Sequence, residues 1–249
     1  MNNPSTSYGD EFYKKQMEGS YNSAHKIVTH LTNHFQPTSV VDVGCGRGTW
    51  LKALKESGAK RLLGIDGPWN TQADMLDQDI VYQQEDLNNP DGIQISEKFD
   101  LAMSLEVAEH LKPEVSVDFI KTIASLSDAT LFSAAYAKQG GKDHINERQH
   151  SFWAEEFARY GFQPYDLFRP VFWGDEDVRF WYQQNCFLYV KEGSELAIKL
   201  GDAGHYPLKN LAFMNCVHPR LYARYTKPPR LTRLKTKIKR RLGHQEDDK

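Results

Sequence analysis

The sequence has no apolar run near the roughly 20 residues that a membrane-spanning helix needs. Its first residues, "MNNPSTSYGDEFYKK", are too polar for the core of a signal peptide. Cysteine is scarce, and Cys45, Cys186 and Cys216 show no CxxC or Cys/His spacing typical of zinc. We therefore expect a cytoplasmic protein, with the three cysteines as reduced thiols that fill small apolar spaces and with no metal site.

The chain also lacks internal repeats, and no low-complexity tract precedes its basic end. Its 249 residues are 40% hydrophobic and 26% charged, which suits one main soluble domain. Charge is unevenly distributed: Arg224 to Lys249 holds ten Lys and Arg against three acids, and the remaining chain holds 21 against 30. This asymmetry indicates an acidic body with a basic arm that meets an anionic partner.

Strand-like and helical segments alternate along the chain, which indicates an α/β fold with a mostly parallel sheet and helices on both faces. We expect a first helix around Ala24 to Leu31. The predicted strands read "SVVDVG", "RLLGID", "DIVYQQ", "FDLAMSL", "ATLFSAA" and, as one long strand, "RFWYQQNCFLYVK". The predicted helices between them read "TWLKALKESG", "NTQADMLDQ", "EVSVDFIKTIASLSD" and "SFWAEEFARYG". We place the main domain at residues 1–195 and a C-terminal helical, basic extension at 196–249.

A glycine loop, "DVGCGRG", follows the first predicted strand. Its spacing is GxGxG, unlike the GxGxxG of dinucleotide-binding folds, and glycines here let a ligand approach the backbone. Asp66 ends the second strand and could accept both hydroxyls of a ribose, and Asp86 follows the third strand, where it could receive an adenine amino group. The alternative interpretations are a turn acid for Asp66 and a helix N-cap for Asp86.

The motifs "VVDVGCGRGTW", "LLGIDG", "EDL" and "FDLAMSLEVAEHL" resemble those of class I S-adenosylmethionine-dependent methyltransferases over roughly residues 8–192. The resemblance implies a Rossmann-like sheet of seven strands, methyl transfer, and S-adenosyl-L-methionine as cofactor. It also implies a set of cofactor-binding residues: Asp42 near the methionine amino group, Gly44, Gly46 and Gly48 under the methionine and ribose, Asp66 at the ribose, Asp86 and Leu87 around the adenine, and Ser104, Leu105 and Glu106 under the sulfonium.

A narrower likeness concerns "LFSAAYAKQGGKDHINERQHSFWAEEFARYGF" and "FWYQQNCFLYV". They resemble a bacterial subgroup often encoded with glycan and polysaccharide biosynthesis genes, whose members usually read "PGQGG" and "HxNEQ". This chain reads "AKQGG" and "HINER", so Arg148 replaces a usual glutamine. The expected reaction is O-methylation of a sugar hydroxyl in a surface polysaccharide, its precursor or a glycoconjugate.

Two histidines are candidates for the general base that would remove the hydroxyl proton. His144 lies on a glycine-flexible loop after the fifth strand; alternatively, His144 and Asn146 simply pin that loop. His110 lies four residues after Glu106 on a predicted helix, where the two side chains would share a face, and it could instead fix that helix. His150 is expected to begin the next helix.

Aromatic and amide side chains mark the predicted acceptor side. Trp173, Trp181 and Tyr182 could pack on a sugar ring, although most such residues belong to a core. The amides of residues 183–185 interrupt an apolar segment, so at least one should join a buried network or a ligand pocket. At the N-terminus, Tyr8, Phe12, Tyr13 and Gln16 match a helix that closes over the cofactor, or a simple packing helix.

Residues 230–242 predict a short amphipathic cationic helix after the Pro228 and Pro229 hinge. It could lie on an anionic cytoplasmic membrane surface, which suits a lipid-linked acceptor, contact nucleic acid phosphates, or have no partner. The sequence favours a glycan or other small-molecule acceptor over RNA, because the body is acidic and no N/D-P-P-Y/F motif follows the fourth strand. A non-catalytic protein that binds S-adenosylmethionine as a regulator or scaffold is the alternative of another class.

Overall fold

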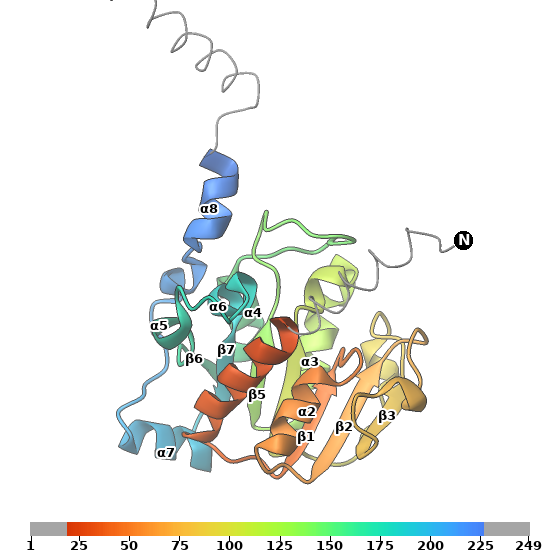
Figure 1. The fold of residues 1–249 in the computed structure, drawn as a ribbon. Coiled ribbons are helices and arrows are strands. Elements are labelled where there is room, and N and C mark those ends of the chain that lie inside the picture. The colour runs from red at the N-terminus through yellow and green to blue at the C-terminus, as the bar shows by residue number, and fades with distance from the viewer. Residues whose placement is uncertain (1–18, 227–249) are drawn as a thin grey trace, which may run out of the picture. The chain divides into compact units, whose positions relative to one another are not determined.

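Seven strands form a single mixed sheet in the order β3-β2-β1-β4-β5-β7-β6 (Figure 1). The strands are β1 (Ser39–Val43), β2 (Arg61–Asp66), β3 (Ile80–Gln84), β4 (Leu101–Leu105), β5 (Ala129–Ser133), β6 (Phe162–Tyr165) and β7 (Phe187–Lys191). β7 pairs antiparallel with both neighbours, and the pairs from β3 to β5 are parallel. This is the Rossmann-like, mostly parallel sheet that the sequence predicted.

The computed structural model describes residues 19–226. The helices are one over residues 19–32, α2 (Thr49–Glu56), α3 (Ser116–Leu126), α4 (His150–Ala158), α5 (Arg169–Phe172), α6 (Phe180–Asn185), α7 (Glu195–Asp202) and α8 (Pro219–Thr226). The predicted lid residues Tyr8, Phe12, Tyr13 and Gln16 and the predicted cationic helix at 230–242 lie outside the described residues.

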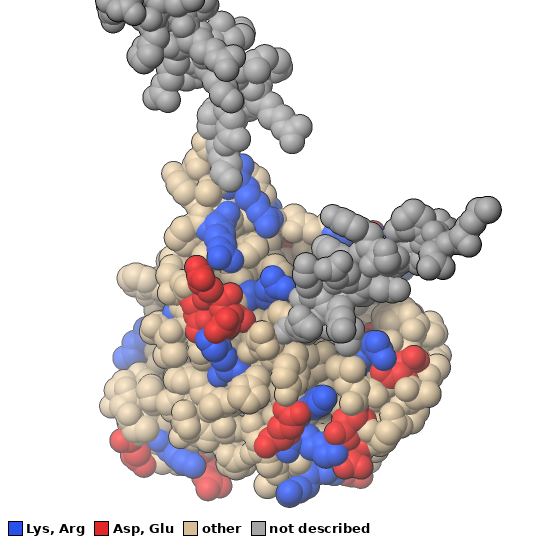
Figure 2. Space-filling view, viewed as in Figure 1, with Lys and Arg blue, Asp and Glu red and all other residues tan. Residues whose placement is uncertain are grey.

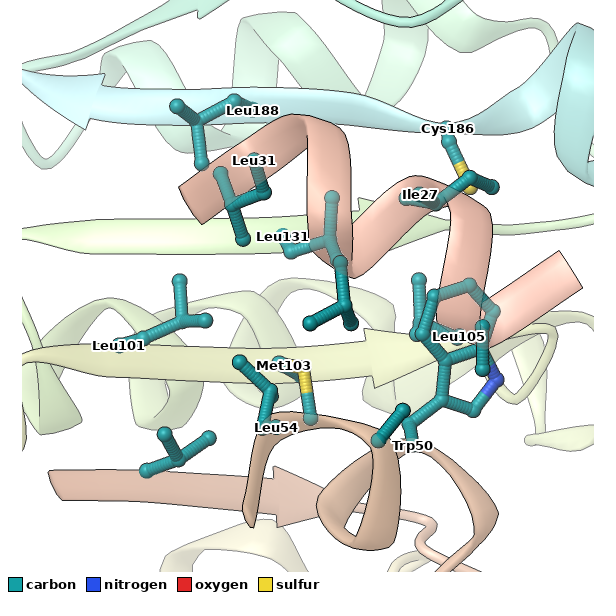
Figure 3. Close-up of a cluster of buried hydrophobic side chains, with 14 of the residues drawn as sticks. Ile27, Leu31, Trp50, Leu54, Leu101, Met103, Leu105, Leu131, Cys186 and Leu188 are labelled. Atoms are coloured by element: carbon teal, nitrogen blue, oxygen red, sulfur yellow. The ribbon is translucent and has the colours of Figure 1, made fainter. Parts of the chain in front are cut away.

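Helices cover both faces of the sheet because each strand at its centre is apolar on both sides. The 19–32 helix and α2 pack on one face, in front of the sheet in Figure 1, and α3 and α4 pack on the other. Figure 3 shows side chains of the first helix, such as Ile27 and Leu31, meeting Leu131 and Leu188 of β5 and β7. These two buried layers fix the strand ends that carry the site.

Three predicted elements are wrong, one of them the helix expected to carry His110, which is a 3-10 turn. The segment read as one long strand is a helix, α6, followed by β7, because the amide side chains of α6 find buried partners that a strand in this sheet would not offer. The predicted helix "NTQADMLDQ" is a single 3-10 turn, Gln72–Asp74, in which the Asp74 carboxylate accepts from Thr71 and the Leu76 N–H donates to the Arg47 carbonyl. Those bonds draw the chain to the glycine loop instead of continuing a helix.

The cysteines are free, and two match their predicted role. Cys45 and Cys186 are buried, where desolvation raises the thiol pKa, but Cys216 is exposed and so fills no apolar space. Contacts divide the chain into two units, Met1–Cys216 and Val217–Lys249. The domain boundary near residue 195 stays a prediction.

In the second unit, Leu221 of α8 is buried, and Arg220 and Arg224 of the same helix are exposed.

The surface of the sheet-bearing unit mixes charges of both signs, as Figure 2 shows. Lys26 pairs with Asp175, and Lys55 pairs with Asp77, at 2.9 and 2.7 Å. Half-buried pairs near the surface such as these contribute about 1 kcal/mol or less each. The acidic excess is therefore partly neutralised locally, and the fold depends mainly on the two buried layers.

Candidate active site

The glycine loop joins β1 to α2 at the carboxyl end of the sheet, and its three glycines serve different purposes. Gly44, Gly46 and Gly48 all have positive φ, at 89°, 54° and 79°. A Cβ on Gly44 would lie 2.3 Å from Cγ2 of Val107, and one on Gly48 would lie 2.7 Å from Cδ1 of Ile80. A Cβ on Gly46 would meet nothing within 4 Å. Gly44 and Gly48 are thus required by packing as well, whereas Gly46 leaves open space beside the backbone.

Asp66 ends β2 and holds this loop in place. Its Oδ2 accepts from the Gly46 N–H at 2.6 Å, and its Oδ1 accepts from the Gly67 N–H at 2.8 Å. Burial raises the pKa of this carboxyl, and the two backbone donors oppose that shift. Asp66 is therefore part of the loop architecture, in addition to its predicted contact with the ribose.

Asp42, inside β1, is 2% exposed, and its Oδ1 has no hydrogen-bond partner among the described residues. Burial, and secondly the charge of Asp66, raise its pKa to about 7. An unpaired buried carboxylate is costly unless a cationic group approaches it. The methionine ammonium of S-adenosylmethionine is such a group, and the open space beside Gly46 lets a ligand approach the loop backbone, so the residues fit this cofactor.

Two more predicted cofactor residues follow β3 at the same edge. Asp86 is exposed, and its Oδ1 accepts from the Asn88 N–H at 2.9 Å, which makes it a turn residue and not a helix N-cap. Leu87 is buried at 4% exposure and packs in the core layer of α3 and α4. Their contact with an adenine stays a prediction.

Ser104 and Leu105 end β4, beside β1 in the sheet, and Glu106 follows directly. Ser104 is fully buried, and its Oγ has no partner among the described residues. Glu106 has a left-handed φ of 57°, and its N–H donates to the Ser133 carbonyl at 3.0 Å. This backbone turn directs the chain away from the sheet just where the resemblance implies the sulfonium.

A buried polar network surrounds the Glu106 carboxylate. Asn185 Nδ2 donates to its Oε1 at 3.0 Å, and Gln139 Nε2 donates to its Oε2 at 3.3 Å. Gln184 Nε2 donates to both Gln139 Oε1 and Asn185 Oδ1. The sequence correctly predicted a network role for at least one amide of residues 183–185, but it missed Gln139 and the link to Glu106, since both depend on where α6 lies.

The third amide of this set, Gln183, has another function. Its Nε2 donates to the carbonyls of Asp175 and Val178, and its Oε1 accepts from the Gly174 N–H. Gln183 thereby satisfies the backbone of the loop before α6.

His110 does not share a helical face with Glu106, contrary to prediction. Residues Ala108–His110 form one 3-10 turn, and the left-handed Glu106 stands before it, so no α-helix relates the two side chains. His110 is exposed, and its Nδ1 lies 3.2 Å from the Asp143 carbonyl oxygen. The inner part of its ring is nonetheless desolvated by the surrounding residues, which lowers the pKa of His110 despite that contact.

His144 lies next to His110, with ring centroids 4.8 Å apart and the rings nearly perpendicular. Its Nδ1 lies 2.8 Å from Glu147 Oε1. The loop itself is pinned by Asn146, whose Nδ2 donates to the Ala108 carbonyl and to Ser116 Oγ. The fold thus assigns loop anchoring to Asn146. The Nε2 end of the His144 ring lies beside Gly141, where a Cβ would come within 2.2 Å of Nε2, so only glycine leaves room for the ring there.

His150 begins α4, as predicted, and is structural. It is 2% exposed, with Nδ1 2.8 Å from the Met214 carbonyl oxygen and Nε2 3.0 Å from Asn185 Oδ1. Burial lowers its pKa to about 4.

The predicted aromatic residues divide between core and surface. Tyr182 is buried, and its ring packs on that of Trp50, with centroids 5.0 Å apart. Trp181 is half-buried against the same core layer, and Trp173 is partly exposed. Tyr182 and Trp50 therefore link α6 to the helix that follows the glycine loop.

The sheet, the glycine loop and the carboxylates of β1 and β2 together define an S-adenosylmethionine-dependent methyltransferase. A family model described as a methyltransferase domain matches residues 13–167, more than half of the chain, and the chain belongs to that family. Its cofactor is S-adenosyl-L-methionine.

Similar proteins agree with this class. The chain is 27% identical over 100 residues to the mitochondrial ubiquinone biosynthesis O-methyltransferase of Dictyostelium discoideum, covering 34% of this chain and 31% of that protein. The match thus spans about a third of that relative's length. Among solved structures, magnesium protoporphyrin IX methyltransferase from Synechocystis PCC 6803 with bound SAM is 19% identical, with a TM-score of 0.50, covering 70% of this chain and 80% of that one. DesVI from Streptomyces venezuelae is 12% identical, with a TM-score of 0.53, covering 77% and 100%. These structures share the fold.

Within residues 19–226, no helix combines the length and the apolar character that crossing a bilayer requires.

Proposed function

We propose that this methyltransferase transfers its methyl group to a hydroxyl oxygen, with a sugar of a surface polysaccharide, its precursor or a glycoconjugate as acceptor. The observation that carries this proposal is the pair of His144 and Glu147. The Glu147 carboxylate holds the His144 Nδ1 proton, so Nε2 keeps a lone pair that can act on a hydroxyl.

A hydroxyl is a poor nucleophile until its proton is removed, and a positioned base contributes about 10²–10⁴-fold. The bound cofactor supplies an activated methyl group. The chain's own residues align the acceptor with the methyl group. Glu106, Gln139 and Asn185 form a hydrogen-bonded network after β4, and the loop anchored by Asn146 carries His144 beside this network. Alignment of this kind is the larger part of an in-line transfer.

The choice of a sugar acceptor is supported by the likeness of residues 131–162 to the glycan subgroup. Arg148, the departure from that pattern, donates from Nε to Asn146 Oδ1 at 2.8 Å and lies over the Phe152 ring. A side chain engaged in this way buttresses the loop and leaves the acceptor space to other residues. The relative from Dictyostelium is named as an O-methyltransferase, which supports transfer to oxygen.

A cytoplasmic enzyme peripheral to the inner membrane would suit a lipid-linked acceptor. The predicted cationic helix at 230–242 is the segment that would contact anionic lipid, each basic residue adding about 1 kcal/mol near the surface.

The test begins with calorimetric titration of the full chain with S-adenosylmethionine and S-adenosylhomocysteine. The protein is then incubated with isotopically labelled methyl donor and lipid-linked glycans, nucleotide sugars or RNA. A labelled methyl on a sugar oxygen, identified by NMR of the product, supports the proposal. Transfer to RNA alone, or to nitrogen, contradicts it, and cofactor binding without any product would favour the non-catalytic alternative.

A further inference from the structure

Three side chains that the cofactor does not need meet beside the predicted acceptor position. Glu109, His110 and His144 each offer one metal-ligating atom, and these atoms all lie within 4.8 Å of one another. Glu109 and His110 belong to the turn after β4, and His144 to the loop after β5. The fold thus brings together a carboxylate and two imidazoles from segments far apart in sequence. For this reason no Cys or Cys/His spacing in the sequence indicated a metal site.

Both imidazoles are held through Nδ1. His110 Nδ1 faces the Asp143 carbonyl oxygen at 3.2 Å, and His144 Nδ1 faces Glu147 Oε1 at 2.8 Å. Because a carbonyl oxygen and a carboxylate only accept, Nδ1 carries the proton in each neutral ring, and Nε2 keeps its lone pair. Metal-binding histidines are oriented in this way, by a backbone carbonyl or a carboxylate on the other ring nitrogen.

The Glu109 carboxylate lacks a counterion. Glu109 is 0% exposed, and neither of its oxygens accepts a hydrogen bond of normal geometry from the described residues. Among residues 19–226, no Lys or Arg forms an ion pair with it. Burial, and secondly the nearby Glu106 carboxyl, raise the pKa of Glu109 well above its usual value. A buried carboxylate without a partner is costly, and a bound cation would remove that cost.

The arrangement is held rigidly by the backbone. The Glu109 carbonyl accepts from the N–H groups of Ile145 at 2.9 Å and Asn146 at 3.0 Å. The Asn146 side chain also bonds to Ala108 and Ser116, so several hydrogen bonds fasten the turn and the loop together next to the cluster. The three ligands are therefore in place before any ion arrives.

We propose that Glu109, His110 and His144 bind one divalent cation of the kind that two imidazoles and a carboxylate prefer, such as Mn²⁺ or Zn²⁺. Three protein ligands leave open coordination positions, and this part of the inference depends on the proposed function: the acceptor hydroxyl oxygen would occupy one of them. A bound divalent cation lowers the pKa of a coordinated hydroxyl. With the cation bound, Nε2 of His144 serves as a ligand and not as the base, so the hydroxyl proton goes to solvent. The oxygen electron pair forms the bond to the methyl carbon, and the electron pair of the broken carbon–sulfur bond stays on sulfur.

The direct test uses the full chain, stripped with a chelator and titrated with MnCl₂ by EPR and calorimetry. We expect about one Mn²⁺ per chain. Glu109→Gln and His110→Ala should each weaken binding at least tenfold, and Glu147→Ala, which removes the acceptor behind His144, should weaken it about 10–100-fold. His25→Ala, an exposed histidine on the first helix, is the control that keeps affinity unchanged.

Titration of the same variants with S-adenosylhomocysteine shows that the cofactor half is folded. If Glu109→Gln does not fold, His110→Ala still tests the site, because His110 is exposed and its replacement should leave the fold intact. The cation site would be overturned if the protein bound no Mn²⁺ and no Zn²⁺, with or without S-adenosylhomocysteine. Full affinity for the ion in both ligand variants would overturn it as well. If chelator-stripped protein transfers methyl groups at an undiminished rate, the proposed function stands and the role of the cation in it is rejected. If the protein binds one cation per chain but transfers no methyl group to any hydroxyl, the cation site stands and the proposed function is rejected.

Discussion

The two halves of this active site are built in different ways. The cofactor half, at β1 and β2, is made of backbone turns and short-range contacts, such as the bond from the Gly46 N–H to Asp66, 20 residues away. The acceptor half, at β4 and β5, is made of side chains from distant segments, such as Asn185 on Glu106, 79 residues away. We infer that the cofactor half depends on backbone features that suit the cofactor alone. The acceptor half then determines which acceptor is methylated.

The largest expected effect lies in the acceptor half. His144→Ala should lower the turnover number by about 10²–10⁴-fold, because the side chain that prepares the hydroxyl is lost. The dissociation constant for S-adenosylhomocysteine should stay within about twofold of wild type, since His144 contacts no residue of the glycine loop.

Steady-state kinetics with the identified acceptor, together with calorimetry, check this. His25→Ala is the matched control and should change neither quantity. An unchanged turnover number would remove His144 from the reaction, and a parallel loss of cofactor affinity would show that the two halves are not separable.

The converse effect belongs to Asp66. Asp66→Ala should weaken binding of S-adenosylhomocysteine about 10–150-fold, the equivalent of losing a charged hydrogen bond worth about 1.5–3 kcal/mol. Calorimetric titration measures it, with Asp202→Ala, an exposed acid at the end of α7, as control. Normal affinity in Asp66→Ala would contradict the ribose assignment.

The same contrast explains what the sequence could predict. The positions of β1 to β5, the glycine loop and Asp66 follow from local patterns, because a strand and the turn after it show their character in their own residues. The helix α6 could not be predicted, since the polar face of Gln183 to Asn185 is stable only where Glu106, Gln139 and the 174–178 loop provide partners. The meeting of Glu109, His110 and His144 likewise depends on the hydrogen bonds that bring the loop after β5 to the turn after β4.

Packing within the cofactor half separates two glycines. Gly44→Ala and Gly46→Ala both place alanine at a positive φ, but only the first drives a Cβ into Val107. Gly44→Ala should therefore lower the free energy of unfolding by about 1–3 kcal/mol more than Gly46→Ala does. Gly46→Ala should instead weaken cofactor binding, because its methyl group points into the open space beside the loop.

Urea denaturation and calorimetry measure these two quantities. The double variant Gly44→Ala/Val107→Ala should recover part of the lost stability by removing the clash. Equal destabilisation by the two single variants would show that backbone strain alone, and not contact with Val107, requires the glycine at position 44.

The smallest effect, a dependence on pH, tests Asp42. Its carboxyl is raised to a pKa of about 7 in the folded chain by burial and by Asp66, so its proton stabilises the protein without cofactor. That stability is fully present below the unfolded pKa of about 4 and is lost as pH rises through about 7.

Cofactor affinity depends on pH in the opposite direction, because the ammonium group requires the ionised carboxylate of Asp42. Between pH 6 and pH 8 the ionised fraction rises about tenfold, so affinity for S-adenosylhomocysteine should rise about tenfold in calorimetry at the two pH values. Asp42→Asn should bind more weakly and lose this slope, whereas Asp118→Asn, on α3, should keep it. A slope that survives in Asp42→Asn would place the titrating group outside the cofactor half and would remove the sharpest chemical distinction between the two halves.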